Sequence, residues 1–161
     1  MSRPGVKKEP AQLRDFHHSL PMELLKAREA AMARFRPMLR QHGLTEQQWR
    51  AIRALAEYQP VDASELARRS FLLAPSLTRI LQFLETEGLV QRSADSGDQR
   101  RSFLTLTTRG YELFASIAPD SEALYAEIEK AFGSKRMEEL YLLLAAFYDV
   151  LGVGEAGGTN Q

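Results

Sequence analysis

The sequence predicts a mainly α-helical fold with a small β-wing, and three observations indicate it. Two short segments with helix-start signals, at Asp62 and at Pro75, follow each other across a tight turn. Two β-favouring runs, 89–92 and 103–106, flank the turn-rich stretch SADSGDQRR. Longer amphipathic segments lie on both sides of this unit. Helix, turn, helix and hairpin in this order are typical of a winged helix-turn-helix domain.

The first predicted helix covers about 19–40, because apolar residues recur there at three- and four-residue spacing. Pro37 must bend this helix or lie near its end. Thr45 and Gln48 have the spacing of a capping box, which predicts a second helix that continues to about Tyr58.

The central helix pair is predicted from its own start and stop signals. Asp62 with Glu65 three residues later has a capping-box arrangement, and residues 71–73 turn the chain toward Pro75. Gly88 is well placed to end the second helix of the pair. That helix is expected to bury one face, formed by Leu77, Ile80, Leu81 and Leu84.

The C-terminal part of the chain is also predicted to be helical. A long helix begins at Thr107, and Pro119 is expected to kink or interrupt it. Ser134 opens a final helix, which carries an apolar stripe along 137–151. The predicted organisation is therefore a flexible leader at 1–18, one domain at 19–151 and a flexible tail at 152–161. Within the domain, the winged helix covers about 45–108, between dimerisation helices at about 19–42 and 108–151.

Composition limits the class of protein. The 161 residues are 44% hydrophobic, which suits one domain with a substantial core. No apolar run approaches the roughly 20 residues that span a bilayer, and the first 15 residues lack a secretory signal pattern. A cytoplasmic protein without membrane contact is expected. The sequence has no cysteine, which excludes disulfides and thiol-based sensing.

The net charge is zero, with 21 basic and 21 acidic residues, but the charges are unevenly distributed. Basic residues predominate between Lys26 and Arg53, and acidic residues predominate after Tyr111. A local positive face therefore remains possible, because salt screens charges beyond about 8 Å at physiological ionic strength.

Several segments together resemble the MarR family of winged-helix regulators. They are 78–79, 84–85, 88–92, 98–101 (DQRR) and 106–110 (LTTRG). The upstream segments 27–32, 35–37 and 44–50, with His42, are similar to the subgroup that controls homoprotocatechuate (3,4-dihydroxyphenylacetate) degradation. The resemblance covers about 20–151. It implies a dimer on a palindromic operator and a small-molecule effector.

The candidate DNA-binding residues lie on the second helix of the pair and on the wing. Arginine, threonine and glutamine side chains can hydrogen-bond phosphates and base edges. We expect Ser76, Thr78, Arg79 and Gln82 to read the operator, with Arg79 on a guanine. The resemblance implies that Arg100 enters the minor groove and that Asp98 holds an arginine by a charge-assisted pair. The alternative is that Asp98 only caps the turn. Arg101 is expected to contact phosphate.

The outer helices carry more apolar surface than a small winged helix can cover, which predicts a homodimer. The expected intermolecular contacts are Leu20, Leu24, Phe147 and Leu151. The alternative is that some of these stripes pack within one subunit.

The resemblance also implies an effector cleft between the terminal helices and the winged helix. A small aromatic acid needs a flat apolar slot and a cationic anchor for its carboxylate. Arg28 is the candidate anchor, Met32, Phe35 and Trp49 the candidate slot, and His42 and Arg50 candidate hydrogen-bond donors. In the alternative interpretation, Trp49 is simply a core residue and His42 caps a helix end.

The function that the resemblance implies is a repressor of an aromatic-compound catabolic operon, released from DNA by a phenolic or aromatic acid or aldehyde. The competing hypothesis is a constitutive winged-helix DNA-binding protein without a ligand. The first hypothesis predicts an anchor charge that is partly buried and unpaired, and the second predicts a filled interior. No metal, cofactor or enzymatic activity is expected, because no metal-ligand spacing, phosphate-binding loop or catalytic motif is present.

Overall fold

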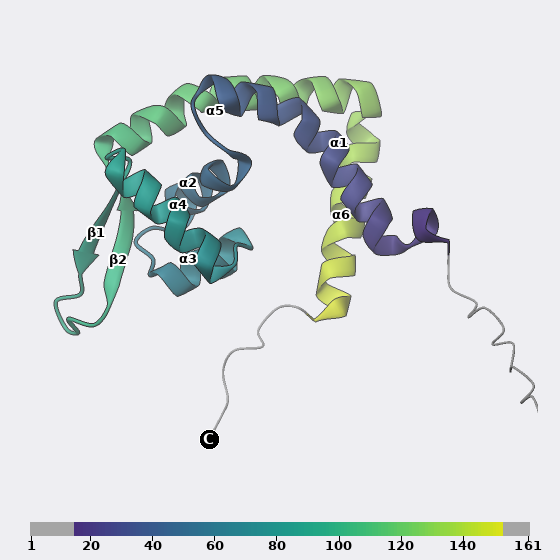
Figure 1. Ribbon diagram of the computed structural model, residues 1–161. Coiled ribbons are helices and arrows are strands. Elements are labelled where there is room, and N and C mark those ends of the chain that lie inside the picture. Colours follow the sequence, from purple (N-terminus) through teal and green to yellow (C-terminus); the bar gives the residue numbers. More distant parts are fainter. Residues whose placement is uncertain (1–14, 153–161) are drawn as a thin grey trace, which may run out of the picture.

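The computed structural model describes residues 15–152, and it confirms the predicted fold class. In chain order, the elements are η1 Phe16–His18, α1 Leu20–Gln41, α2 Glu46–Tyr58, α3 Ala63–Ser70, α4 Ala74–Thr86, β1 Val90–Ala94, β2 Ser102–Leu106, α5 Thr108–Phe132 and α6 Ser134–Leu151. Figure 1 shows the helices α2–α4 and the hairpin below one half of α5, with α1 and α6 below the other half.

The predicted leader and tail fall largely on residues 1–14 and 153–161, which lie outside the described residues. Residues 15–18 are described, and they form the short helix η1, in which the Asp15 carboxylate accepts the His17 backbone N–H at 2.8 Å.

The helix starts follow the expected capping chemistry, with one exception. Thr45 and Gln48 bond reciprocally, which confirms the capping box of α2. Asp62 accepts the Glu65 backbone N–H at 2.8 Å, but the Glu65 carboxylate bonds to arginines of α3. The expected box at α3 is therefore only half formed, because an ion pair offers this carboxylate a stronger partner than a backbone N–H.

The hairpin is antiparallel and pairs Val90 with Leu106 and Ala94 with Ser102. β1 extends two residues further toward the turn than the sequence predicted. Gly88, at φ +68°, ends α4 as predicted. Shortly after β2, Gly110 is buried against the Leu89 carbonyl, where any side chain would collide.

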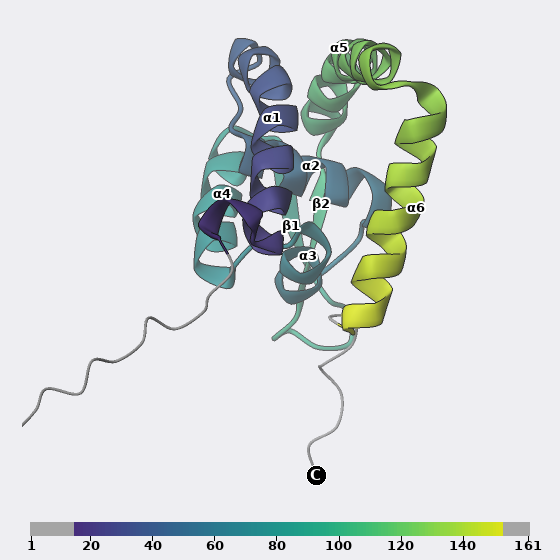
Figure 2. The same ribbon diagram turned by 90° about the vertical axis from the view of Figure 1, so that its right-hand side faces the viewer.

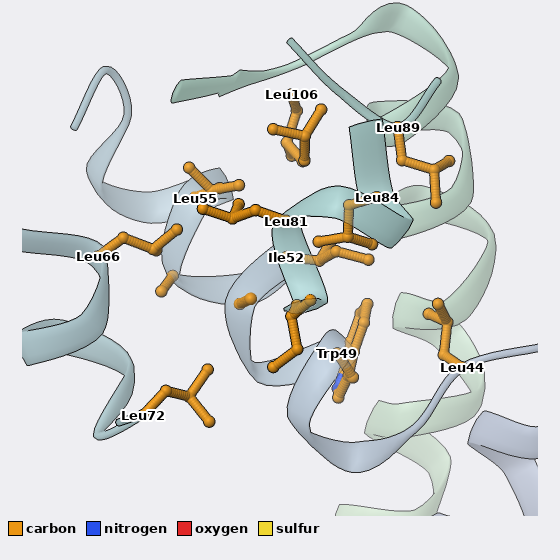
Figure 3. Packing of buried hydrophobic residues seen from close by; sticks show 14 of the residues in the cluster. Leu44, Trp49, Ile52, Leu55, Leu66, Leu72, Leu81, Leu84, Leu89 and Leu106 are labelled. Atoms are coloured by element: carbon orange, nitrogen blue, oxygen red, sulfur yellow. The ribbon is translucent and has the colours of Figure 1, made fainter. Parts of the chain in front are cut away.

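The core lies between α2, α4 and the hairpin (Figure 3). The predicted apolar face of α4 is buried, and Ile52, Leu55, Leu66, Leu84 and Leu104 have no exposed surface. α5 joins this core through Ile117. The α5 residues Leu113, Leu124, Tyr125 and Ile128 are partly buried and pack around the same cluster.

α5 continues through Pro119 without a break, so the expected interruption does not occur. Figure 2 shows α1 and α6 on opposite sides of the molecule, both beside α5. None of the 18 residues of α6 is buried. Within residues 15–152, no helix is long and apolar enough to cross a membrane.

Candidate functional site

The outward face of α4 carries the residues predicted to read DNA. Thr78, Arg79 and Gln82 are exposed and Ser76 is half-buried, while the apolar residues between them point into the core. The Thr78 hydroxyl donates to the Ala74 carbonyl at 3.0 Å, so it can only accept a hydrogen bond from another group. Within the described part of the chain, the side chains of Arg79 and Gln82 form no hydrogen bond or ion pair.

The turn of the wing is closed by its own carboxylates. Asp98 accepts the Arg100 backbone N–H at 2.9 Å, and Asp95 accepts that of Gly97 at 3.0 Å. The Asp98 carboxylate forms no ion pair with any residue between 15 and 152. The turn-capping alternative therefore describes Asp98, and the charge-assisted pair expected for it is not present.

A different carboxylate pairs with a wing arginine. Arg101 donates to Asp62 at 3.3 Å, which links the wing to the start of α3. Its guanidinium also lies 5.9 Å from the centre of the Phe103 ring. Arg100 has no such partner within residues 15–152, so its charge remains available to a ligand.

The two arginines of α3 are held by one carboxylate. Arg68 and Arg69 donate to Glu65 at 2.7 and 2.6 Å, and these bonds lower the pKa of Glu65 from 4.5 to about 2. Arg69 also lies over the Tyr58 ring at 4.2 Å. The positive charge of α3 is therefore partly compensated, unlike that of Arg79.

The predicted effector anchor is already paired. Arg28 bonds to Glu29 at 2.9 Å and to Glu46, while Arg36 bonds to the same two carboxylates at 2.7 and 2.8 Å. The hydrogen bond from Arg28, followed by that from Arg36, lowers the pKa of Glu46. The expectation of an unpaired anchor is wrong for Arg28, because the chain supplies its counter-ions from α1 and α2.

Arg50 holds the turn between α3 and α4. Its guanidinium donates to the carbonyls of Ser70 and Phe71 at 3.3 and 3.4 Å and lies 3.8 Å from Glu46. Burial lowers its pKa, and the nearby charge of Arg28 adds to this effect. Arg50 therefore has a structural partner in addition to the role predicted for it.

The remaining predicted ligand residues do not meet at one cavity. His42 pairs with Asp120 at 3.2 Å and lies 14 residues beyond Arg28, about 21 Å along α1 at the usual helical rise. Trp49 and Phe35 are both 8% exposed; Trp49 stacks on Phe114 and Phe35 packs on Tyr125. Met32 packs partly buried against the same core. The core interpretation of Trp49 therefore holds.

An open groove of about 800 Å³ lies elsewhere, between α2, α5 and α6. Arg53 lines it from α2 and forms no ion pair within the described residues. Tyr125, Met137, Tyr141 and Leu142 give the groove an aromatic and apolar wall, and Glu122, Glu129 and Glu138 add carboxylates. Sequence reasoning missed Arg53, although its position one helical turn after Trp49 places it on the same side of α2.

The predicted dimer contacts lie on uncovered surface. Leu20, Leu24 and Leu151 are 52%, 38% and 59% exposed, and Phe147 is half-buried. Such large apolar side chains in water are unfavourable when they are gathered on two helices. Among residues 15–152, no group of three or more histidine and acidic residues could hold a metal ion.

Comparison with known proteins gives consistent matches. A family model described as the MarR family matches residues 44–102. The homoprotocatechuate degradative operon repressor of Escherichia coli is 45% identical over 131 residues, covering 81% of this chain and 88% of that protein.

Two solved structures match the same extent of the chain. The transcriptional regulator PA4135 has a TM-score of 0.79 and 43% identity, over 82% of this chain and 97% of that one. NadR in complex with 4-hydroxyphenylacetate has a TM-score of 0.72 and 44% identity, over 84% and 96%. These matches extend beyond the winged unit into the flanking helices.

Proposed function

Because this chain belongs to the MarR family of winged helix-turn-helix regulators, we propose that it represses an operon for the degradation of an aromatic compound. A small phenolic or aromatic acid releases it from its operator. The observation that carries the proposal is the exposed polar face of α4, directly beside the wing. The protein acts in the cytoplasm, with its DNA, and catalyses no reaction.

The proposed reading of DNA follows from the chemistry of the exposed side chains. Arg79 binds the O6 and N7 atoms of a guanine, a contact that contributes about 1–3 kcal/mol of discrimination. Thr78 accepts from a base amino group, because its own hydrogen is committed to Ala74. Gln82 reads a neighbouring base edge, Arg100 enters the minor groove, and Arg101 contacts phosphate from its position beside Asp62.

The operator is palindromic because the protein is a homodimer. Two copies place their α4 helices about one helical turn of DNA apart when their apolar terminal helices pack together. Leu20, Leu24, Phe147 and Leu151 contribute to that interface. The exposure of Leu20 and Leu151 in the single chain supports this assignment.

The effector binds in the groove between α2, α5 and α6. Arg53 is the anchor for its carboxylate, because this guanidinium has no competing carboxylate partner, whereas Arg28 has two. Tyr125 and Tyr141 stack on the ring. The glutamates of the groove accept a hydrogen bond from a phenolic hydroxyl, which favours hydroxylated acids over plain ones.

Two relatives suggest which acids to test. One represses an operon for homoprotocatechuate, and the other was solved with 4-hydroxyphenylacetate; both compounds are hydroxylated phenylacetates. Binding of the purified protein to DNA from its own upstream region is measured by fluorescence anisotropy, at one salt concentration, with each acid and with phenylacetate. The two hydroxylated acids are expected to weaken operator binding by about tenfold or more, and phenylacetate by less.

The outcomes separate the two functional hypotheses. Tight binding that no acid changes would favour a constitutive winged-helix regulator. Arg53→Leu is expected to raise the acid concentration needed for release by about tenfold, since a hydrogen bond to a charged group contributes about 1.5–3 kcal/mol. Arg28→Leu is the matched control and should shift it less. The reverse order would restore Arg28 as the anchor.

A further inference from the structure

An aromatic contact joins the C-terminal end of α6 to the turn between α3 and α4. The rings of Phe71 and Tyr148 lie 6.0 Å apart with an interplanar angle of 82°, an edge-to-face arrangement. α6 packs mainly on α5, which it follows directly in the chain. Figure 2 shows α6 descending from the end of α5 past α2 toward the level of α3. The Phe71 contact is therefore a second attachment, at the far end of α6.

Phe71 itself has an unusual backbone. Its φ of 51° lies in the left-handed region, and no other non-glycine residue between 15 and 152 has a positive φ. A bulky residue keeps such a conformation only when its surroundings determine it. Arg50 helps to hold this conformation, because its guanidinium donates to the Phe71 carbonyl at 3.4 Å and to the Ser70 carbonyl at 3.3 Å.

The position of Phe71 fixes where the DNA-reading helix begins. α4 starts at Ala74, three residues after Phe71, and Leu72 between them is buried in the core. The short connection leaves little freedom between the turn and the helix. A displacement of Phe71 would therefore displace the N-terminal end of α4, which carries Thr78 and Arg79.

The groove lies between the elements that hold Phe71. Tyr141 lines the groove, and Tyr148 follows seven residues later, on the same face of α6. On the opposite wall, Arg53 lines the groove three residues after Arg50, again on neighbouring positions of one helix face. A molecule in the groove therefore contacts α2 about one helical turn from Arg50 and α6 about two helical turns from Tyr148. These two residues contact Phe71 in the turn between α3 and α4.

We propose that Phe71 and Tyr148 are a positioning pair that sets the start of α4 relative to α6 and transmits the presence of an acid in the groove to the DNA-reading helix. The pair touches neither the acid nor the DNA and acts through α4. The transmission of acid binding rests on the proposed function. The positioning of α4 by the Phe71–Tyr148 pair does not depend on any ligand.

A double-mutant cycle on operator affinity, measured without acid, tests whether the pair positions α4. Phe71→Gly removes the ring and suits the positive φ, so the variant should fold without added strain. Tyr148→Leu removes the partner ring. Each variant is expected to change the operator Kd by about threefold or more, and the double variant no more than either single one, because the residues act as a unit. Effects that multiply in the double variant would overturn the proposal.

The operator Kd of the wild type, the two single variants and the double variant is then measured again in the presence of saturating 4-hydroxyphenylacetate. The ratio of operator Kd with acid to Kd without acid is expected to fall at least about threefold in each single variant. Phe83→Leu, an aromatic loss on α4 away from α6, is the matched control and should keep the wild-type ratio. Wild-type ratios in both single variants would overturn the transmission role. A wild-type protein indifferent to every acid tested would contradict the proposed function instead, and the acid-free cycle would still decide the pair.

Discussion

The winged unit and the C-terminal helix contain similar apolar residues in opposite surroundings. α4 buries four apolar residues within 13 positions, whereas α6 buries none within 18. Leu81 is 2% exposed, while Leu143 and Val150 are 69% and 85% exposed. Both helices repeat their apolar residues at helical spacing. The pattern that forms a core in one region therefore leaves an open surface in the other.

This difference separates two meanings of an apolar stripe. In α4, the stripe faces α2 and the hairpin of the same chain, so short-range topology supplies its cover. α6 projects from the end of α5, and apart from its packing on α5 and the Phe71 contact it meets little of its own chain. A stripe of this size on an isolated helix is unfavourable in water. A second copy of the chain is the cover that the proposed dimer provides.

Leucine-to-alanine substitutions in the two regions test this distinction most strongly. Leu81→Ala should destabilise the chain by about 2–5 kcal/mol, because it leaves a cavity in a closed core. Leu143→Ala should cost little in the folding of one chain, but it should raise the dimer dissociation constant by about tenfold, the loss of one buried contact. Thermal unfolding measures the first effect and sedimentation equilibrium the second. An unchanged association of Leu143→Ala would remove this stripe from the interface.

Two arginines of the winged unit also differ in their surroundings, because Arg69 is paired within the chain and Arg79 has no partner among residues 15–152. Arg79→Ala should weaken operator binding by about 1–3 kcal/mol, because an exposed guanidinium without a partner is available to a base. Arg69→Ala should weaken it less, since its charge already meets Glu65 and the Tyr58 ring. Anisotropy titrations at one salt concentration compare them. Equal losses for both variants would indicate a general electrostatic role for Arg79.

Much of the fold was predictable because its signals are local. The capping box at Thr45, the turn before α4 and the glycine at 88 each depend on a few neighbouring residues. The family resemblance and the buried face of α4 followed from equally short patterns. Pro119 was expected to kink or interrupt α5, but α5 is continuous through it, and Ile117 and Ser121 are buried on either side of the proline.

The candidate site was less predictable because its chemistry depends on partners far apart in the sequence. Nothing near Arg28 shows that Glu46, 18 residues later, takes its charge. Likewise, Arg101 meets Asp62 across 39 positions, whereas Asp98 caps the turn of the wing. Arg53 stands out only when α6 is placed opposite it. Sequence patterns indicated which types of residue form the site. Only the folded arrangement shows which of these side chains have no partner and are available to a ligand.

The Asp62–Arg101 pair should have a smaller effect than the substitutions above. Asp62→Asn keeps an N-cap for α3 but removes the charge that holds the wing arginine. Because both side chains are partly exposed, the stability change should stay below about 1 kcal/mol. Operator affinity should rise slightly, since Arg101 gains freedom to meet phosphate. A loss of affinity in an anisotropy titration would show that Asp62 orients Arg101 for DNA.

The smallest expected effect is the pH dependence that Glu65 gives the winged unit. Its pKa falls from 4.5 to about 2 because the hydrogen bonds from Arg68 and Arg69 favour the ionised form. Between these values the unfolded chain binds more protons than the folded one, so stability decreases as the pH falls. The contribution is therefore complete above about pH 4.5 and is lost progressively toward pH 2. Glu65→Gln should narrow the difference between urea midpoints at pH 7 and pH 3. Glu139 lies on α6 and forms no ion pair among residues 15–152, so Glu139→Gln should keep the wild-type difference between the two midpoints. If Glu65→Gln also keeps it, the solvent screens the interaction of Glu65 with Arg68 and Arg69 almost completely.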